Sequence, residues 1–157
     1  MKPSEKLQQI RRKVESTLAD NKDLDFLLKE IPMQIEKRTR LGKGVSDTGE
    51  LIKLNPLSEG YVKQRKKGKL SSLTSPKKSN LTRTGEMLSS IFGIRRGTIF
   101  TFFFGGTRED GESNNNVARY AREKGRPFFD LSTSERNGLQ RKISKVIKES
   151  IKKLFDK

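Results

Sequence analysis

Residues 91–104 read IFGIRRGTIFTFFF, and this stretch decides the fold. The pattern predicts a β-hairpin, with one strand at Ile91–Ile94, a turn at Arg95–Gly97 and a second strand at Thr98–Phe104. Successive side chains of a strand point to opposite faces of its sheet. The second strand is therefore apolar on both faces, with Ile99 and Phe103 on one, and Phe100, Phe102 and Phe104 on the other. Each face needs an element that covers it.

A long C-terminal helix is predicted to cover one of these faces. Residues 131–155 read LSTSERNGLQRKISKVIKESIKKLF, in which Ser132 precedes Glu135 by the three-residue spacing of a capping box. Roughly 22 residues of helix extend about 33 Å, the length of a small domain. We expect this helix to be a principal core element, because it carries one aliphatic stripe that comprises Leu139, Ile143, Val146, Ile147, Ile151 and Leu154.

The N-terminal region predicts one or two helices between Pro3 and about Ile31, with apolar residues at three- and four-residue steps. Pro32 is expected to end this helical region. Residues 34–56 mix Gly, Asp and isolated apolar residues without a sustained period, which favours irregular structure. Two covers remain open for the second face of the hairpin: the N-terminal helix, or a neighbouring subunit.

Two short helices are predicted on either side of a basic loop. Ser58 is expected to cap a helix that runs to about Lys67, with Tyr61 and Val62 on its inner side. After the loop, either Thr82 or Thr84 is expected to cap a helical turn. This turn directs three apolar residues towards the core, namely Met87, Leu88 and Ile91.

A joint is predicted at residues 117–132, which read VARYAREKGRPFFDLS. Asn115 or Asn116 is expected to cap a short helix through Glu123. Gly125 ends this helix, and Pro127 blocks its continuation. The inward residues of this helix are expected to be Val117, Tyr120 and Ala121. A short strand then follows at Phe128–Leu131. The joint sets the angle between the short helix, the sheet and the long helix.

These elements predict an α+β fold in a single domain over residues 1–157. We expect an antiparallel sheet of about three to four strands packed against the long C-terminal helix, with an N-terminal helix and a long basic loop. Residues 1–45 form an N-terminal helical arm, residues 46–85 an irregular segment with a short helix and the basic loop, and residues 86–157 the α+β core. The aromatic residues expected in the core or at an interface are Phe100, Phe102, Phe103, Phe104, Phe128 and Phe129.

The composition argues against an enzyme. The chain has no cysteine and no histidine, so it lacks disulfides, thiolate metal sites and the commonest general base. Its one acidic cluster, Glu109, Asp110 and Glu112, lacks the ligand spacing of a calcium loop and is expected to be a solvated loop tip. We expect no metal and no cofactor, and we expect neither a signal peptide nor a membrane span.

Positive charge is concentrated in one segment of this strongly basic chain. The net charge is +16, and residues 61–85 contain eight Lys and Arg residues and no acid. The segment is either a solvated loop or a site that contacts phosphates or an acidic protein surface. Its candidate contact residues are Lys63, Arg65, Lys66, Lys67, Lys69, Lys77 and Lys78. A second candidate patch comprises Arg119, Arg122 and Arg126, for which simple solvation is the alternative.

Three stretches of the sequence resemble blocks of the phage virion morphogenesis and tail completion proteins of tailed bacteriophages. They are LSEGYVKQRKKG at residues 57–68, LTRTGEMLSSI at residues 81–91 and VARYAREKGRPFFDLS at residues 117–132. Their order and approximate spacing also agree with the family, and the resemblance covers about Asp47 to Ile151. One departure is that Arg122 and Glu123 stand where many members have His-Gln.

The resemblance implies a small structural protein of the virion, without catalytic residues, that assembles as a ring at the neck or at the head-proximal end of the tail. Its partners would be other neck and tail proteins, and its basic residues could make non-specific contacts with packaged DNA. The alternative is a small basic nucleic-acid-binding protein of the RNA-binding or nucleoid type. Residues 100–104 argue against that alternative, because they contain no basic residue among the aromatic ones.

Overall fold

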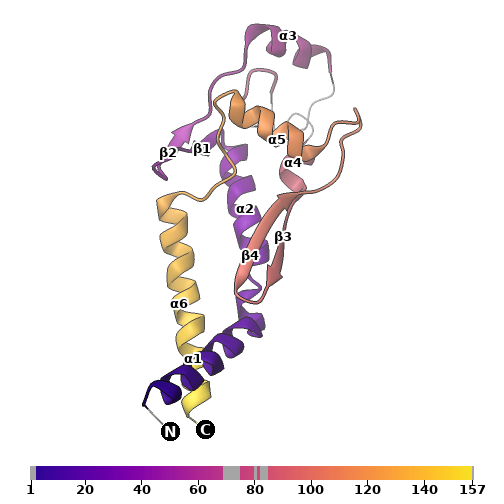
Figure 1. The fold of residues 1–157 in the computed structure, drawn as a ribbon. Coiled ribbons are helices and arrows are strands. Elements are labelled where there is room, and N and C mark those ends of the chain that lie inside the picture. Colours follow the sequence, from indigo (N-terminus) through magenta and orange to yellow (C-terminus); the bar gives the residue numbers. More distant parts are fainter. Residues whose placement is uncertain (1–2, 69–74, 80, 82–84, 157) are drawn as a thin grey trace.

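The computed structural model describes residues 3–68, 75–79, 81 and 85–156. The fold is α+β, with a long helix near each end of the chain and two small antiparallel sheets (Figure 1). The long helix α2 lies between α6 and the hairpin β3–β4, and α1 crosses α6 at the end of the molecule that holds both termini. The elements are α1 (Pro3–Ala19), η1 (Lys22–Leu24), α2 (Leu27–Arg40), β1 (Lys43–Val45), β2 (Leu51–Lys53), α3 (Glu59–Lys67), α4 (Glu86–Ser89), β3 (Ile91–Arg96), β4 (Ile99–Phe104), α5 (Asn114–Glu123) and α6 (Thr133–Phe155).

The predicted hairpin is confirmed, with a first strand two residues longer than expected and a second strand that begins one residue later than expected. β3 and β4 pair in register from Ile91 opposite Phe104 to Arg96 opposite Ile99. The two residues between the strands begin with Gly97 at φ 59°, the positive φ that a tight two-residue hairpin turn requires at this position. Arg95 and Arg96 therefore belong to the first strand and not to the turn.

The inner face of this hairpin packs on α2 and not on the C-terminal helix, so the predicted cover is wrong. A methyl group on Gly93 would lie 2.9 Å from Leu28 Cδ2 and 2.6 Å from the Phe102 ring, which shows how closely α2 approaches the sheet. The four strands also form two separate two-stranded sheets and not one sheet. α2 can cover the hairpin because it continues well past the point where the sequence predicted its end.

α2 contains Pro32, which was expected to end the N-terminal helical region, and it runs on to Arg40. Proline removes one hydrogen bond from a helix. The buried side chains of Leu27, Ile35 and Thr39 hold the helix against its neighbours on either side of that position. The expectation of irregular structure after Pro32 is wrong for a second reason, since β1 and β2 pair as a short hairpin within residues 34–56.

The main hydrophobic core lies where α2, α4, α5 and the start of the hairpin meet. Its buried residues are Ile35, Met87, Leu88, Ile91, Ala118, Ala121 and Phe128. The prediction that Met87, Leu88 and Ile91 face the core is confirmed. α6 contributes less than predicted, because Leu139 is its buried side chain and the rest of its aliphatic stripe is half-buried. The reason is that α6 lies against α1 and η1 and does not cover a sheet.

The joint after α5 is irregular, so the predicted strand at Phe128–Leu131 is wrong. Its carbonyl groups are bound by other parts of the chain and do not form a ladder. The Val45 amide donates to the Pro127 carbonyl at 3.0 Å, and the Arg38 guanidinium donates to the carbonyls of Phe128 at 2.6 Å and Asp130 at 2.7 Å. α2 and the β1–β2 hairpin thus set the path of the chain into α6.

The N-cap residues of three helices can be compared with the caps predicted from the sequence. The capping box at Ser132 and Glu135 is confirmed, and so is the Ser58 cap of α3. α5 is capped by Ser113 and not by either predicted asparagine, because the helix already begins at Asn114. Thr82 and Thr84 lie outside the described residues. Four side chains expected to point inward do so incompletely or not at all: Val62 and Val117 are half-buried, and Tyr61 and Tyr120 are exposed.

Gly44 is predicted to be essential to the contact between β1 and the joint. A methyl group there would lie 2.1 Å from the Pro127 carbonyl oxygen and 2.8 Å from Leu54 Cδ2. We expect Gly44→Ala to lower the free energy of unfolding by about 1–3 kcal/mol, measured by urea denaturation, because backbone must move. The control is Gly138→Ala in α6, where nothing lies within 4 Å. That change should stabilise the protein by about 0.5–1 kcal/mol, and a Gly44 variant as stable as the wild type would contradict the contact.

Candidate functional site

The acidic loop between β4 and α5 shows no sign of a metal centre. Within the described residues, no group of three or more Asp and Glu side chains is arranged to hold a metal ion. Arg108 forms ion pairs with Asp110 at 3.0 Å and with Glu86 at 3.9 Å, so part of this acidic charge is already balanced. No helix in the described part of the chain is both long enough and apolar enough to span a membrane.

The outer face of the β3–β4 hairpin is apolar and exposed. Cross-strand partners share a face, so the observed register places Phe92 beside Phe103 and Ile94 near Ile99 on the side away from α2. We define the hairpin face as these four residues, whose exposed fractions are 46% for Phe92, 37% for Ile94, 66% for Ile99 and 41% for Phe103. The rings of Phe92 and Phe103 lie 5.7 Å apart and form the centre of the patch.

The sequence placed Ile99 and Phe103 on a common face, and the burial pattern confirms this. It did not identify Phe92 and Ile94 as their neighbours, although the alternation of Phe92, Ile94 and Arg96 was a usable signal. On the opposite face, Phe100, Phe102 and Phe104 are half-buried against α2. Phe104 also packs on the joint, with ring centroids 5.8 Å from Phe128 and 4.4 Å from Phe129. Phe128 is buried, and Phe129 is 39% exposed.

Arg95 attaches the hairpin to the C-terminal end of α1. Its guanidinium donates hydrogen bonds to the carbonyls of Leu18 at 2.8 Å, Ala19 at 2.9 Å and Asn21 at 2.6 Å. It also forms an ion pair with Asp25 at 2.7 Å. A cation at this position compensates the partial negative charge at a helix C-terminus. The sequence assigned Arg95 to a turn, because nothing local indicates that a helix end lies beside it.

Arg38 connects α2, the joint and the start of α6. Its side chain is 5% exposed, and its guanidinium forms an ion pair with Glu135 in addition to its bonds to the two joint carbonyls. Burial lowers the pKa of Arg38, and the carboxylates of Glu135 and Asp130 oppose that shift. Glu135 therefore has two functions, since it closes the capping box of α6 and neutralises a buried cation.

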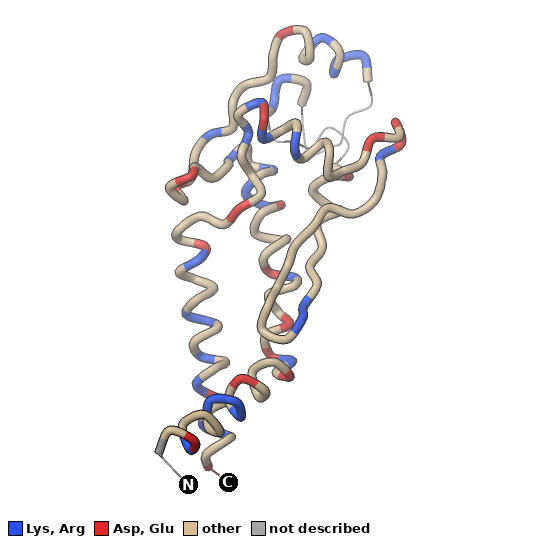
Figure 2. The backbone as a smooth tube through the Cα atoms, in the orientation of Figure 1, with Lys and Arg blue, Asp and Glu red and all other residues tan. Residues whose placement is uncertain are grey.

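The predicted basic segment forms a cluster on and beside α3, at the end of the molecule remote from the termini (Figure 2). Arg65 is not part of that surface, because its side chain is 2% exposed. It donates to the Lys78 carbonyl at 3.0 Å, which holds residues 75–79 against α3. Lys69 lies outside the described residues. We define the α3 basic cluster as the exposed side chains of Lys63, Lys66, Lys67, Lys77 and Lys78.

The three arginines predicted as a second patch do not form one contact surface. Arg119 is exposed and lies 3.8 Å from Glu123, its partner four residues along α5. Arg122 is also exposed. Arg126 is half-buried and holds neighbouring loops, because its guanidinium donates to the carbonyls of Asn55 at 3.2 Å and Pro56 at 2.9 Å. Arg126 therefore has a structural contact where the sequence predicted a partner contact.

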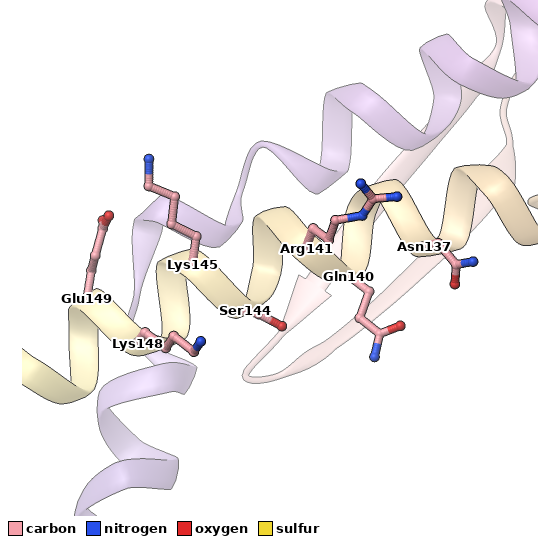
Figure 3. Close-up of a pocket in the computed structure, with 7 residues that line it drawn as sticks. All are labelled: Asn137, Gln140, Arg141, Ser144, Lys145, Lys148 and Glu149. Atoms are coloured by element: carbon pink, nitrogen blue, oxygen red, sulfur yellow. The ribbon is translucent and has the colours of Figure 1, made fainter.

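A cationic surface that the sequence analysis missed runs along α6. We define the α6 outer face as the exposed cations Arg141, Lys145, Lys148 and Lys152 with the exposed polar residues Asn137, Gln140 and Ser144. Six of these residues, with Glu149, line an open pocket along the helix (Figure 3). The four cations are spaced four, three and four residues apart, which places them on one side of the helix. This spacing was visible in the sequence, but the helix was interpreted only from its aliphatic stripe.

Comparison with known proteins identified no relative of the chain. No family, no curated protein and no solved structure matches the chain. A functional interpretation therefore depends on the sequence blocks and on the three surfaces: the hairpin face, the α3 basic cluster and the α6 outer face.

Proposed function

We propose that the protein is a structural component of a tailed bacteriophage virion, which joins head and tail at the neck as one subunit of a ring. The hairpin face carries this proposal. A ring of identical subunits needs two different complementary patches on each copy. An exposed aromatic patch on an otherwise polar protein indicates a protein–protein contact. We propose that the hairpin face is one of those patches.

The size of the patch fits this role. Complete burial of a large apolar side chain contributes about 1.5–3 kcal/mol. The four side chains of the hairpin face are between 37% and 66% exposed, so covering them would contribute on the order of 3–6 kcal/mol. The partly covered aliphatic stripe of α6 offers further apolar surface.

The positions of the resemblance blocks also support the proposal. The block at residues 81–91 and the block at residues 117–132 meet in the main core through Leu88, Ala121 and Phe128. The block at residues 57–68 contains α3 and most of its basic cluster. Two blocks therefore contain residues that build the fold, and the third contributes a charged surface.

The charge of the chain sets a condition on assembly. Each subunit carries a net charge of +16, so identical copies repel one another at low ionic strength. Apolar contact must overcome that repulsion. Self-association through the hairpin face should therefore strengthen as salt is raised, whereas contacts with nucleic acid weaken with salt.

The assembly test uses the double variant Ile99→Glu/Phe103→Glu. We expect the wild-type protein to form closed rings at high protein concentration and moderate salt, and the variant to remain monomeric because two charges interrupt the apolar patch. Light scattering after size exclusion gives the mass, and negative-stain electron microscopy shows the rings. The control is Met33→Glu, at an exposed apolar position on α2 outside the patch. A wild-type protein that stays monomeric under all these conditions, or a double variant that assembles equally well, would defeat the proposal.

A small nucleic-acid-binding protein is the second candidate, and the exposed lysines of the α3 basic cluster favour it. Binding to duplex DNA distinguishes the two functions. Tight binding by the isolated subunit at physiological salt supports the nucleic-acid function. Weak binding that disappears with salt agrees with the neck function.

A further inference from the structure

We infer that the α6 outer face binds the phosphate backbone of duplex DNA. This inference concerns a different surface from the hairpin face and does not depend on the proposed assembly. Four cations, Arg141, Lys145, Lys148 and Lys152, lie along one side of α6. Eleven residues of helix separate the first from the last, which corresponds to about 16 Å. One DNA strand carries a phosphate for about every 3.4 Å of duplex axis, so the array can follow several consecutive phosphates.

The cations of this face are available to a ligand. Among the described residues, none of these four side chains lies within ion-pair distance of a carboxylate. Two other cations of α6 do have such a partner. Arg136 is paired with Asp130 at 2.8 Å, and Lys142 is paired with Glu30 on α2 at 2.5 Å. Of the five α6 cations without an ion pair among the described residues, four lie on the α6 outer face, and Lys153 is the fifth.

The chemistry of the face selects a phosphate backbone over a protein surface. Between the cations stand the amides of Asn137 and Gln140 and the hydroxyl of Ser144, and all three can donate hydrogen bonds to phosphate oxygens. The α6 outer face contains no apolar or aromatic side chain. The centre of a protein–protein interface is instead enriched in aromatic residues and depleted in lysine.

The same composition favours a duplex over a single strand. Proteins that bind single strands stack the bases on aromatic side chains. The α6 outer face offers only charges and hydrogen-bond donors, which suit the regular phosphates of a duplex. The binding should therefore have no preference for base sequence, because no group on this face is placed by a neighbour to read base edges.

The test compares two triple variants with the same change of charge. The first, Arg141→Gln/Lys145→Gln/Lys148→Gln, removes three cations of the α6 outer face. The second, Lys63→Gln/Lys66→Gln/Lys67→Gln, removes three from the α3 basic cluster. All six positions are exposed, and Gln is nearly as good a helix former as Lys or Arg, so both variants should fold. Circular dichroism and a thermal melt check this.

Fluorescence anisotropy with a labelled 20-base-pair duplex, titrated between about 50 and 200 mM salt, gives the slope of log affinity against log salt. Each phosphate contact contributes about 0.9 to the magnitude of that slope, so the α6 variant should lose about 2.7. The α3 variant should retain most of the wild-type slope. Glu149→Gln removes the one acid that lines the pocket and should strengthen binding. An unchanged slope in the α6 variant, or an equal loss in both triple variants, would overturn the inference.

The second arm replaces the duplex with labelled poly-glutamate at the same salt. We expect poly-glutamate to bind more weakly than DNA, and we expect its affinity to change little in the α6 variant. Poly-glutamate that binds as tightly as the duplex, with the same loss in the α6 variant, would show that the face recognises acidic protein, and that result would also overturn the inference.

Discussion

Replacing Arg38 with methionine is expected to lower the free energy of unfolding by about 3–5 kcal/mol, because it leaves a partly buried carboxylate and two carbonyl groups without their donor. Methionine fills much of the volume but donates no hydrogen bond. The groups left behind are the carboxylate of Glu135 and the carbonyls of Phe128 and Asp130. The carboxylate retains its bonds from Ser132, at 2.7 Å from the amide and 2.8 Å from the hydroxyl, so α6 should still begin at the same residue.

Urea denaturation followed by circular dichroism measures this loss. Arg38→Lys should lie between the wild type and the methionine variant, because a single ammonium group cannot reach three acceptors with the fixed fork of a guanidinium. The matched control is Arg136→Met, which breaks an exposed ion pair with Asp130 and should cost no more than about 1 kcal/mol. If Arg38→Met and Arg136→Met unfold at the same urea concentration, the joint is not held by Arg38.

Replacing Arg95 with glutamine should destabilise the protein by about 2–3 kcal/mol and release α1 from the hairpin. The arginine side chain is 11% exposed and donates hydrogen bonds to three carbonyl groups. Those of Leu18 and Ala19 belong to the last turn of α1, and that of Asn21 follows the helix. Glutamine is too short and too weak a donor to replace these bonds. α1 is amphipathic but has little buried surface of its own, with Leu7 67% exposed, so it depends on this attachment and on α6.

Amide hydrogen exchange measured by mass spectrometry should show faster exchange over Pro3–Ala19 in this variant, with the core around Leu88 still protected. Arg96→Gln is the control. Arg96 is the next residue in β3, points to the exposed face of the hairpin, and should change stability by less than about 0.5 kcal/mol. Equal exchange rates over α1 in both variants would show that Arg95 does not attach this helix.

Local signals account for the parts of the fold that were predicted correctly. The β3–β4 hairpin follows from an apolar run interrupted by Gly97, which permits the tight turn. The start of α6 follows from Ser132 and Glu135, whose side chains satisfy each other's backbone amides. Each signal is complete within a few residues of sequence, so no knowledge of the rest of the chain was required.

The errors have a common cause in long-range packing. Pro32 normally ends or kinks a helix, but here the buried faces on both sides of it hold α2 together to Arg40. The joint carries Phe128 and Phe129 in a pattern typical of a strand. Its carbonyl groups do not pair with another strand, because they accept hydrogen bonds from Arg38, ninety residues away in sequence. Local propensity is a weak preference, and contacts of this kind override it.

The candidate surfaces divide in the same way. Lys63 and its exposed neighbours could be predicted, since a run of cations without acids remains on the surface in most folds. The hairpin face could be predicted only in part. The strand pattern placed Ile99 and Phe103 on the same face, but it did not show which face of the hairpin would remain exposed. Arg65 was wrongly placed on the surface, and Arg126 is half-buried. Each of them holds loops together through carbonyl groups.

By itself, the sequence determined the class of fold, the hairpin, the caps of α3 and α6, the absence of histidine and cysteine chemistry, and the excess of positive charge. Only the tertiary structure decided that α2 covers the hairpin, that Arg38 and Arg95 are nearly buried, and that four cations of α6 without an ion pair are exposed on one side of the helix. The physical reason is that turns and caps are satisfied by neighbours along the chain. The burial of an arginine depends on acceptors that only the folded chain brings to it.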